Sequence, residues 1–303
     1  MAAWILLLLP FSLASYGRAE YKSATFIAMI IVGFFTLFIF AAWERFFARV
    51  HFIDYKLIKK RTVLGACVVS GVTNFSFSTW NLYFLNFCTV VYDLSQSMAG
   101  YMNQIYNVGS PFFGVVIGLW MRFTKEFKYT CLCFALPLLI LGAGLMIKFR
   151  GQGDDIGYII MCQIFIAFGG GSLVIGQEMA VMAASDREGI PMMLALIGLF
   201  QSLGSAMGSA VQVAIYTNVY VSALTSKLPD DLKSQAMNLS GQGYLAQQKY
   251  PMGSPARDAI NYAWGYEQKI GCIAATAILG LALPSVAIWK NYRLDKNSKG
   301  TVI

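Results

Sequence analysis

Hydrophobic residues fall in long runs separated by short polar stretches, and most of the runs are as long as a membrane-spanning helix. A helix that crosses the hydrocarbon core needs about 20 apolar residues in succession. Windows of this length pick out apolar segments at residues 2–16, 24–43, 62–87, 96–120, 129–147, 156–184, 190–217 and 269–289. The pattern therefore predicts an all-α membrane protein with about eight transmembrane helices.

The first segment, residues 2–16, is the shortest and has two interpretations. A signal peptide has this length, but the segment has no basic residue before its apolar run and carries Pro10 within it. The other interpretation is a transmembrane helix that lacks its beginning, which agrees with the short polar hinge at 17–20 before the next run. We favour the transmembrane helix.

Composition excludes a soluble globular protein. Of the 303 residues, 57% are hydrophobic and 13% are charged, whereas an ordinary soluble domain carries about 25% charged residues. The formal net charge of +8 comes from Lys and Arg residues that cluster in short loops between the apolar segments. We therefore expect a lipid bilayer, and not nucleic acid, as the partner of this chain.

Residues that bind metals or carry out catalysis are not grouped in the sequence. The six cysteines include no Cys-x-x-Cys pair, and His51 is the one histidine. The run 169–171 has three glycines but lacks the Lys and Ser/Thr of a nucleotide-binding loop. We expect no metal site, no cofactor, no catalytic residue and no enzymatic activity, and an ATP-driven pump is disfavoured.

Basic residues are concentrated in alternate loops, and this asymmetry predicts the orientation of the chain. Lys and Arg are dense in 44–61, in 121–128 and in the tail after residue 289. Such loops remain in the cytosol, so we expect both ends of the chain there. The long stretch 218–268 then forms an outer loop.

Uncharged polar residues recur at helical spacing in three of the predicted helices. As glue between helices each is worth about 0.6 kcal/mol, and for a single residue this role and cavity lining are equally plausible. Three such stripes together favour a polar cavity for a bulky, weakly charged solute that forms hydrogen bonds. The candidate cavity residues are Asn81, Tyr83, Asn103, Asn107 and Gln201.

Glu178, within the apolar segment 156–184, is predicted to be the clearest buried acid of the chain. A carboxylate in mid-membrane costs about 2.5–3.5 kcal/mol on insertion scales, so it needs a partner or a proton. Three roles remain open for this side chain: an ion network on the cytosolic side with Arg122 or Arg187, proton coupling, and snorkelling to solvent. Glu178, Arg122 and Arg187 are therefore the candidate coupling or gating residues.

Tyr262, Trp264 and Tyr266 precede the last apolar segment, at the predicted outer interface. Trp and Tyr gather at membrane interfaces as an aromatic belt, which is the simplest interpretation. Gating of the substrate by these outer-loop aromatic residues is the alternative.

Two pairs of glycines, Gly114 with Gly118 and Gly204 with Gly208, have the four-residue spacing that lets helices approach closely. Small residues are common in membrane helices, so these pairs predict packing and carry no functional inference.

Several longer motifs resemble fungal siderophore-iron transporters of the major facilitator superfamily. They are Asn86–Ser95 followed by Ala99–Tyr101, then Gly169–Ala184, Gly198–Gly204 and Tyr250–Trp264, and together they extend over most of the chain. The loop motif of the superfamily, Gly-x-x-x-Asp-Arg-x-Gly-Arg, appears only in part at Gly118–Lys128, without its Asp. The resemblance therefore does not carry the gating network of that motif over to this chain.

The resemblance implies the C-terminal half of a transporter with two six-helix halves and two extra helices between them. Residues 1–61 would be these two linker helices with a basic cytosolic loop, and residues 62–303 the six-helix half with outer loop 218–268. The N-terminal half is missing, and alternating access requires both halves. We therefore expect this chain to be part of a longer protein, with the missing half as a partner.

The implied function is uptake of ferric siderophores in symport with protons, with the iron held by its chelator and not by protein ligands. The resemblance also implies that the outer loop with Tyr262, Trp264 and Tyr266 handles the siderophore. The plasma membrane is the expected location, with the endosomal or vacuolar membrane as alternatives. Two other functions stay open: a proton antiporter that exports drugs or toxins, and a truncated membrane interaction partner without transport.

Overall fold

The computed structural model describes residues 24–46 and 59–292, except 152, 154 and 186–188, together with residues 6 and 10. All elements in this part of the chain are helical, and no strand occurs there. They are α2 (Ala24–Phe46), α4 (Arg61–Asn81), α5 (Phe84–Val91), α6 (Gln96–Thr124), α7 (Lys128–Thr130), η1 (Cys131–Ala135), α8 (Leu136–Phe149), α9 (Ile156–Ala184), α10 (Ile190–Ile215), η3 (Tyr216–Tyr220), α11 (Val221–Lys227), α12 (Asp230–Lys233), α13 (Ala236–Gly241), α14 (Tyr244–Gln247), α15 (Pro255–Leu279) and α16 (Ala282–Ala287). The predicted all-α class is confirmed.

Five helical stretches of the described chain are long and apolar enough to cross a membrane. They are Arg61–Val91, Lys128–Phe149, Ile156–Ala184, Ile190–Lys227 and Pro255–Ala287. The predicted segments 24–43 and 96–120 also form helices, α2 and α6. Segment 2–16 lies outside the described residues, apart from positions 6 and 10.

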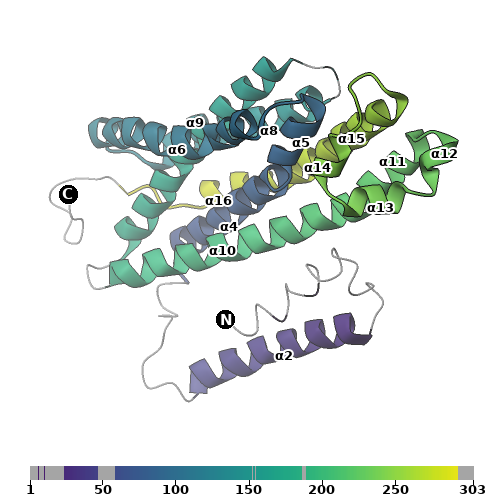
Figure 1. Ribbon diagram of the computed structural model, residues 1–303. Coiled ribbons are helices and arrows are strands. Elements are labelled where there is room, and N and C mark those ends of the chain that lie inside the picture. The colour runs from purple at the N-terminus through teal and green to yellow at the C-terminus, as the bar shows by residue number, and fades with distance from the viewer. Residues whose placement is uncertain are drawn as a thin grey trace.

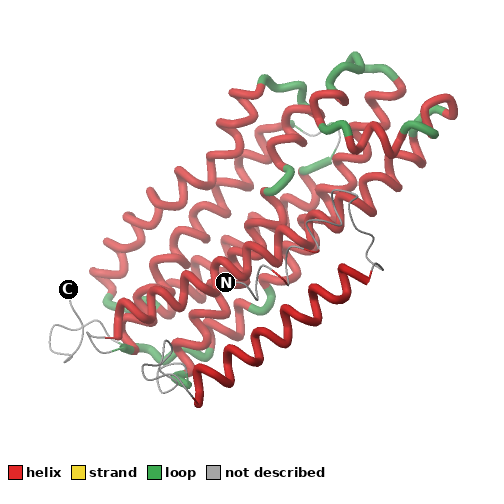
Figure 2. The backbone as a smooth tube through the Cα atoms, turned by 60° about the horizontal axis from the view of Figure 1, so that its bottom comes forward, coloured by secondary structure: helices red, strands yellow, loops and turns green. Residues whose placement is uncertain are grey.

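The long helices of the bundle run side by side (Figure 2), and α4 lies in the middle of the bundle (Figure 1). Its packing partners include α10, α15, α9 and α16. By contrast, α2 lies beside the bundle (Figure 1), and many of its apolar side chains, such as Phe35, Ile39 and Phe46, are exposed. Such a surface suits a helix that faces lipid.

Side-chain caps determine where three of the long helices begin. The Ser95 hydroxyl accepts a hydrogen bond from the Met98 amide at the start of α6, and the Asp155 carboxylate does so from Gly157 at the start of α9. At α15 the Ser254 hydroxyl accepts from the Arg257 amide, with Pro255 in the first turn. Each cap satisfies an amide that has no partner within its helix.

Three predicted boundaries differ from the structure. The segment 62–87 is broken between α4 and α5, at residues 82–83. The expected outer loop 218–268 is much shorter, because the helix after 190 continues to Lys227 and α15 begins at Pro255, which leaves residues 228–254 between them. The extra turns are rich in polar and aromatic residues that pack against other helices, so hydropathy alone ended the predicted helices too early.

Glycines set the closest helix contacts. A Cβ atom at Gly204 would meet the carbonyl oxygen of Gly71 on α4, and one at Gly208 would meet that of Phe75. This confirms the close packing predicted for the pair on α10. The pair on α6 behaves differently, because a Cβ at Gly118 would meet nothing within 4 Å.

Candidate functional site

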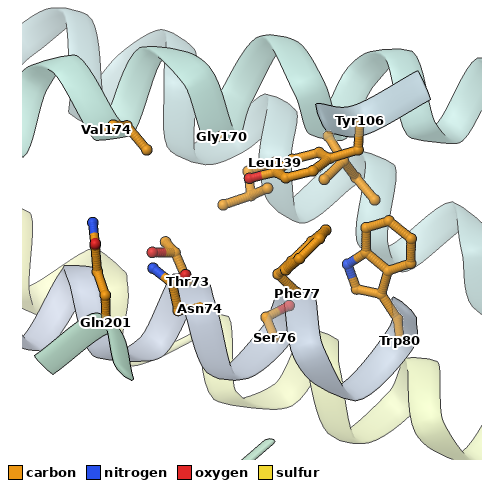
Figure 3. A pocket seen from close by; sticks show the side chains of 11 residues that line it. Thr73, Asn74, Ser76, Phe77, Trp80, Tyr106, Leu139, Gly170, Val174 and Gln201 are labelled. Carbon is orange, nitrogen blue, oxygen red and sulfur yellow. The ribbon is translucent and has the colours of Figure 1, made fainter. Parts of the chain in front are cut away.

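A cavity of about 100 Å³ lies between α4, α6, α8, α9 and α10 (Figure 3). Thr73, Asn74 and Gln201 form its polar end, and the rings of Trp80 and Tyr106 lie at the other end (Figure 3). The remaining lining residues are Ser76, Phe77, Leu139, Ile166, Gly170 and Val174. The arrangement offers amides and hydroxyls at one end and aromatic faces at the other.

Aromatic contacts and one glycine shape the apolar end of the cavity. The ring of Phe77 stacks on that of Tyr106 with centroids 4.6 Å apart, and Trp80 meets Tyr106 edge-on at 6.0 Å. A Cβ atom at Gly170 would lie 2.8 Å from the Tyr106 hydroxyl oxygen. Gly170 therefore allows the Tyr106 side chain to reach over α9 and close this end.

The size of the cavity limits what these helices can enclose. Pockets that bind drug-sized ligands measure about 300–1,000 Å³, whereas this cavity is about 100 Å³. The cavity between the described helices is therefore too small to enclose a ligand of that size.

Of the predicted cavity residues, Gln201 lines the cavity. Asn81 and Asn103 lie elsewhere, each with a buried side-chain oxygen that has no hydrogen-bond partner. Asn107 is exposed on α6 and donates to Gln104 at 2.9 Å. Tyr83 lies beyond the end of α4, with its ring centroid 4.6 Å from that of Tyr216.

Helix geometry explains this separation. The break at residues 82–83 places Tyr83 outside α4, and Asn107 lies on the exposed side of α6. Sequence reasoning did not select Trp80 and Tyr106 as cavity residues. The polar residues at helical spacing in segment 62–87 include Asn74, which lines the cavity, and this spacing was the available signal.

The predicted charge network around Glu178 is not formed in the part of the chain that the structure describes. Glu178 is half-buried on α9, and Arg122 is exposed in the last turn of α6 with no ion pair to it. Arg187 lies outside the described residues. The prediction that Glu178 is the clearest buried acid was wrong, because Glu267 is completely buried.

The three outer aromatic residues lie within α15, on two different sides of the helix. Tyr262 and Tyr266 are 39% and 44% exposed with stacked rings, whereas Trp264 is 1% exposed. The indole nitrogen of Trp264 donates to Gln247 Oε1 at 2.8 Å, and its ring packs on Tyr216. Trp264 is therefore a core residue, and the two tyrosines are available at the surface.

Arg257 ties the connecting segment 228–254 to the bundle. Its guanidinium is completely buried and donates to the carbonyl oxygens of Gln247 and Tyr250, both at 3.1 Å, and of Val90 at 2.6 Å. The Asp93 carboxylate lies 3.4 Å from its Nη2. One charged group thus joins α15, the connecting segment and the end of α5.

Substitution of Arg257 by Ala should release this segment. Hydrogen bonds to charged groups contribute about 1.5–3 kcal/mol each, so loss of several should speed proteolytic cleavage within 228–254 at least about tenfold. Limited proteolysis with mass spectrometry measures this rate. Lys249→Ala, at an exposed position of the same segment, is the matched control and should leave the rate unchanged; equal rates for both variants would contradict the assignment.

A second buried charge, Arg150, caps the end of α8. Its Cζ lies 5.0 Å from the centroid of the Trp80 ring and 4.3 Å from that of Phe84. Nη1 donates to the Trp80 carbonyl oxygen at 2.7 Å and to Gln268 Oε1 at 2.6 Å. Nε and Nη2 are buried without a hydrogen-bond partner.

Glu267 lies next to this arginine, halfway along α15. Its two carboxylate oxygens accept hydrogen bonds from Gln212 Nε2 and, at 2.9 Å, from Gln268 Nε2. Gln268 therefore bridges Arg150 and Glu267, which form no direct ion pair in the described structure. We call these four residues, Arg150, Gln212, Glu267 and Gln268, the buried charge network.

Sequence reasoning missed this network because it assigned Arg150 to a loop and Glu267 to the outer stretch. Burial of a charge costs several kcal/mol unless a partner compensates it, so their joint burial requires them to be neighbours. A usable signal was present: Asn261, Trp264 and Gln268 recur at the spacing of one helix face.

Comparison with curated proteins identifies relatives that extend over nearly the whole chain, whereas no family model matches it. The chain is 68% identical to "Siderochrome iron transporter 2" of Aspergillus fumigatus, over 100% of this chain and 50% of that protein. It is 43% identical to "MFS siderochrome iron transporter 1" of Ajellomyces capsulatus, over 98% of this chain and 51% of the relative. It is 35% identical to "Siderophore iron transporter 1" of Schizosaccharomyces pombe, over 97% of this chain and 48% of the relative.

The chain thus spans about half the length of the relatives it matches. Those relatives carry the name of transporters, and the apolar helices of this chain are those of an integral membrane protein. The resemblance found in the sequence motifs is confirmed by this identity. Over its whole length the chain is thus similar to about half of the siderochrome iron transporters of the major facilitator superfamily.

Proposed function

We propose that this chain forms the C-terminal half of a carrier that takes up ferric siderophores in symport with protons. The observation that supports it most strongly is the 68% identity, over the whole chain, to a protein named as a siderochrome iron transporter. The proposed location is the plasma membrane.

The chemistry of the cavity agrees with such a substrate. Siderophore complexes present many oxygen atoms that accept hydrogen bonds, and the Gln201 and Asn74 amides and the Thr73 hydroxyl line one end of the cavity. The aromatic faces at the other end suit the organic framework of the chelator. In this proposal the iron travels inside its chelator as cargo.

The second wall of the site would come from an N-terminal half. Alternating access requires two halves around a central site, and α6 exposes a row of large apolar side chains that such a half would cover. The row comprises Val108, Phe112, Val115, Leu119 and Phe123.

The remaining candidate residues take roles at the two ends of the carrier. Glu178, Arg122 and Arg187 would act in cytosolic gating, because the predicted topology places the end of α9 on that side. Tyr262 and Tyr266 would contact the siderophore at the outer surface, where they are exposed. Trp264 would support them from the core, because it is buried.

Uptake of radioactive iron tests the proposed function. The chain is fused behind the N-terminal half of the Aspergillus fumigatus relative and expressed in a yeast strain without siderophore carriers. We expect uptake of iron from ferric siderophores, and growth on them as sole iron source. Absence of uptake together with increased resistance to toxins would overturn the proposal in favour of export. Absence of both would favour a non-transporting interaction partner.

A pair of variants tests the cavity in the same assay. Gln201→Leu should reduce uptake about tenfold, because loss of a buried hydrogen bond to the solute costs about 1–3 kcal/mol. Asn107→Leu changes the same kind of side chain at an exposed position and should retain more than half of the uptake. Equal uptake by both variants would remove Gln201 from the proposed site.

A further inference from the structure

The buried charge network and the cavity share one residue. Trp80 lines the cavity with its ring, and its carbonyl oxygen accepts a hydrogen bond from Arg150. Gln268 continues this chain of contacts from Arg150 to Glu267. A change in the charge of Glu267 can therefore affect Trp80 in the cavity wall through the hydrogen-bonded side chains of Gln268 and Arg150.

The ionisable groups around Glu267 leave it with one positive neighbour. In the described structure Arg150 is that neighbour, at the end of α8, and its charge attracts the carboxylate through Gln268. Tyr216 and Tyr220 on η3, and Cys272 on α15 itself, are further titratable groups near Glu267, and none of them can carry a positive charge. Helix α4 contributes Trp80, which has no charge.

The hydrogen bonds of Glu267 suit both states of the carboxyl group. When ionised, it accepts from the side-chain amides of Gln212 and Gln268, as observed. When protonated, it needs an acceptor, and Gln212 Oε1 is buried beside it without a hydrogen-bond partner. Rotation of the Gln212 amide presents this oxygen to the carboxyl proton.

We infer that Glu267 is the proton-binding group of this half of the carrier and that Arg150 is its charge partner. This inference rests on the proposed function and gives its proton-coupling step a residue. A proton from the outer solution binds a carboxylate oxygen of Glu267 and is released from the same oxygen to the cytosolic side, so no other reactant is needed. Loss of the negative charge of Glu267 leaves the positive charge of Arg150 without a compensating charge. Its Nε and Nη2 atoms remain without a hydrogen-bond partner.

The Arg150 guanidinium then attracts the oxygen atoms of the siderophore. It lies next to the cavity, because it donates a hydrogen bond to Trp80, which lines the cavity. Binding of proton and of substrate thereby support each other, as symport requires. Glu178 lacks these features: it is half-buried, and no positive side chain pairs with it in the described structure.

Two transport measurements on the fused carrier test the inference. Net accumulation requires the proton, whereas exchange of external for internal ferric siderophore does not. We expect Glu267→Gln to lower accumulation at least about tenfold and to remove its pH dependence, with exchange within about twofold of the unsubstituted carrier. Asp258→Asn, at an exposed position of the same helix, is the matched control and should keep accumulation that depends on pH. Accumulation by Glu267→Gln with normal pH dependence would overturn the inference.

Chemical labelling of the unsubstituted carrier provides a test that does not depend on the folding of a variant. Dicyclohexylcarbodiimide reacts with protonated carboxyl groups in apolar surroundings. We expect mass spectrometry to find Glu267 labelled, less so as pH rises and more so in the presence of ferric siderophore, because bound siderophore favours the protonated carboxyl group. Labelling of Glu178 alone would overturn the inference. Glu267 labelling without siderophore uptake by the unsubstituted carrier would support the proton site and refute the proposed function.

Discussion

Replacement of Arg150 by Met should destabilise the folded chain more than any other single substitution considered for this protein. The guanidinium is completely buried and is the positive group nearest Glu267. Removal of one partner from a buried charged pair costs about 3–5 kcal/mol, because the other charge remains without compensation. For a chain of this size the melting temperature should fall by about 10 °C.

Thermal unfolding in detergent with a thiol-reactive dye measures this change, because five of the six cysteines are buried until the protein unfolds. Lys148→Met, two residues earlier at an exposed position, should leave the melting temperature nearly unchanged. The double variant Arg150→Met with Glu267→Gln should recover part of the loss, because it removes both charges. Additive effects of the two substitutions would show that the groups do not interact.

A single methyl group at Gly208 should separate α10 from α4. The added carbon of Gly208→Ala meets the carbonyl oxygen of Phe75, which belongs to a helix backbone and cannot turn away. Overpacking of this kind costs about 1–3 kcal/mol. The melting temperature in the same dye assay should therefore fall by about 5 °C.

Gly198→Ala is the control for this prediction, since it adds the same methyl group to the same helix. A Cβ atom at Gly198 meets nothing within 4 Å, and alanine favours helix more than glycine does. Gly198→Ala should thus leave the melting temperature unchanged or raise it slightly. An equal decrease in both variants would mean that the loss comes from α10 itself and not from its contact with α4.

Much of the helical architecture could be predicted because the bilayer imposes a length and a composition on each spanning helix. Residues 156–184 were predicted as one segment and form α9 with the same bounds. The prediction failed where helices contain polar residues that face other helices. The Ser254 cap and Pro255 mark the start of α15, but hydropathy does not detect a helix whose first half buries Arg257, Asn261 and Glu267.

The candidate site was less predictable than the fold. Periodicity identifies a polar face on a helix, and on α4 that face includes Asn74, which lines the cavity. Periodicity does not say which neighbour that face meets, so Asn107 and Gln201 looked equivalent although one is exposed and the other lines the cavity. The proximity of Arg150 to Glu267 could not be predicted either, because 117 positions separate these residues in the sequence.

The sequence by itself determined the class of this protein: apolar runs of helix length and few charges suffice for an α-helical membrane protein, because the bilayer acts on every helix separately. Only the tertiary structure decided which polar side chains act together. Contacts between helices place Arg150 beside Glu267 and Trp80 beside both the network and the cavity. Such contacts depend on the distance between side chains in space, which the order of residues along the chain does not contain.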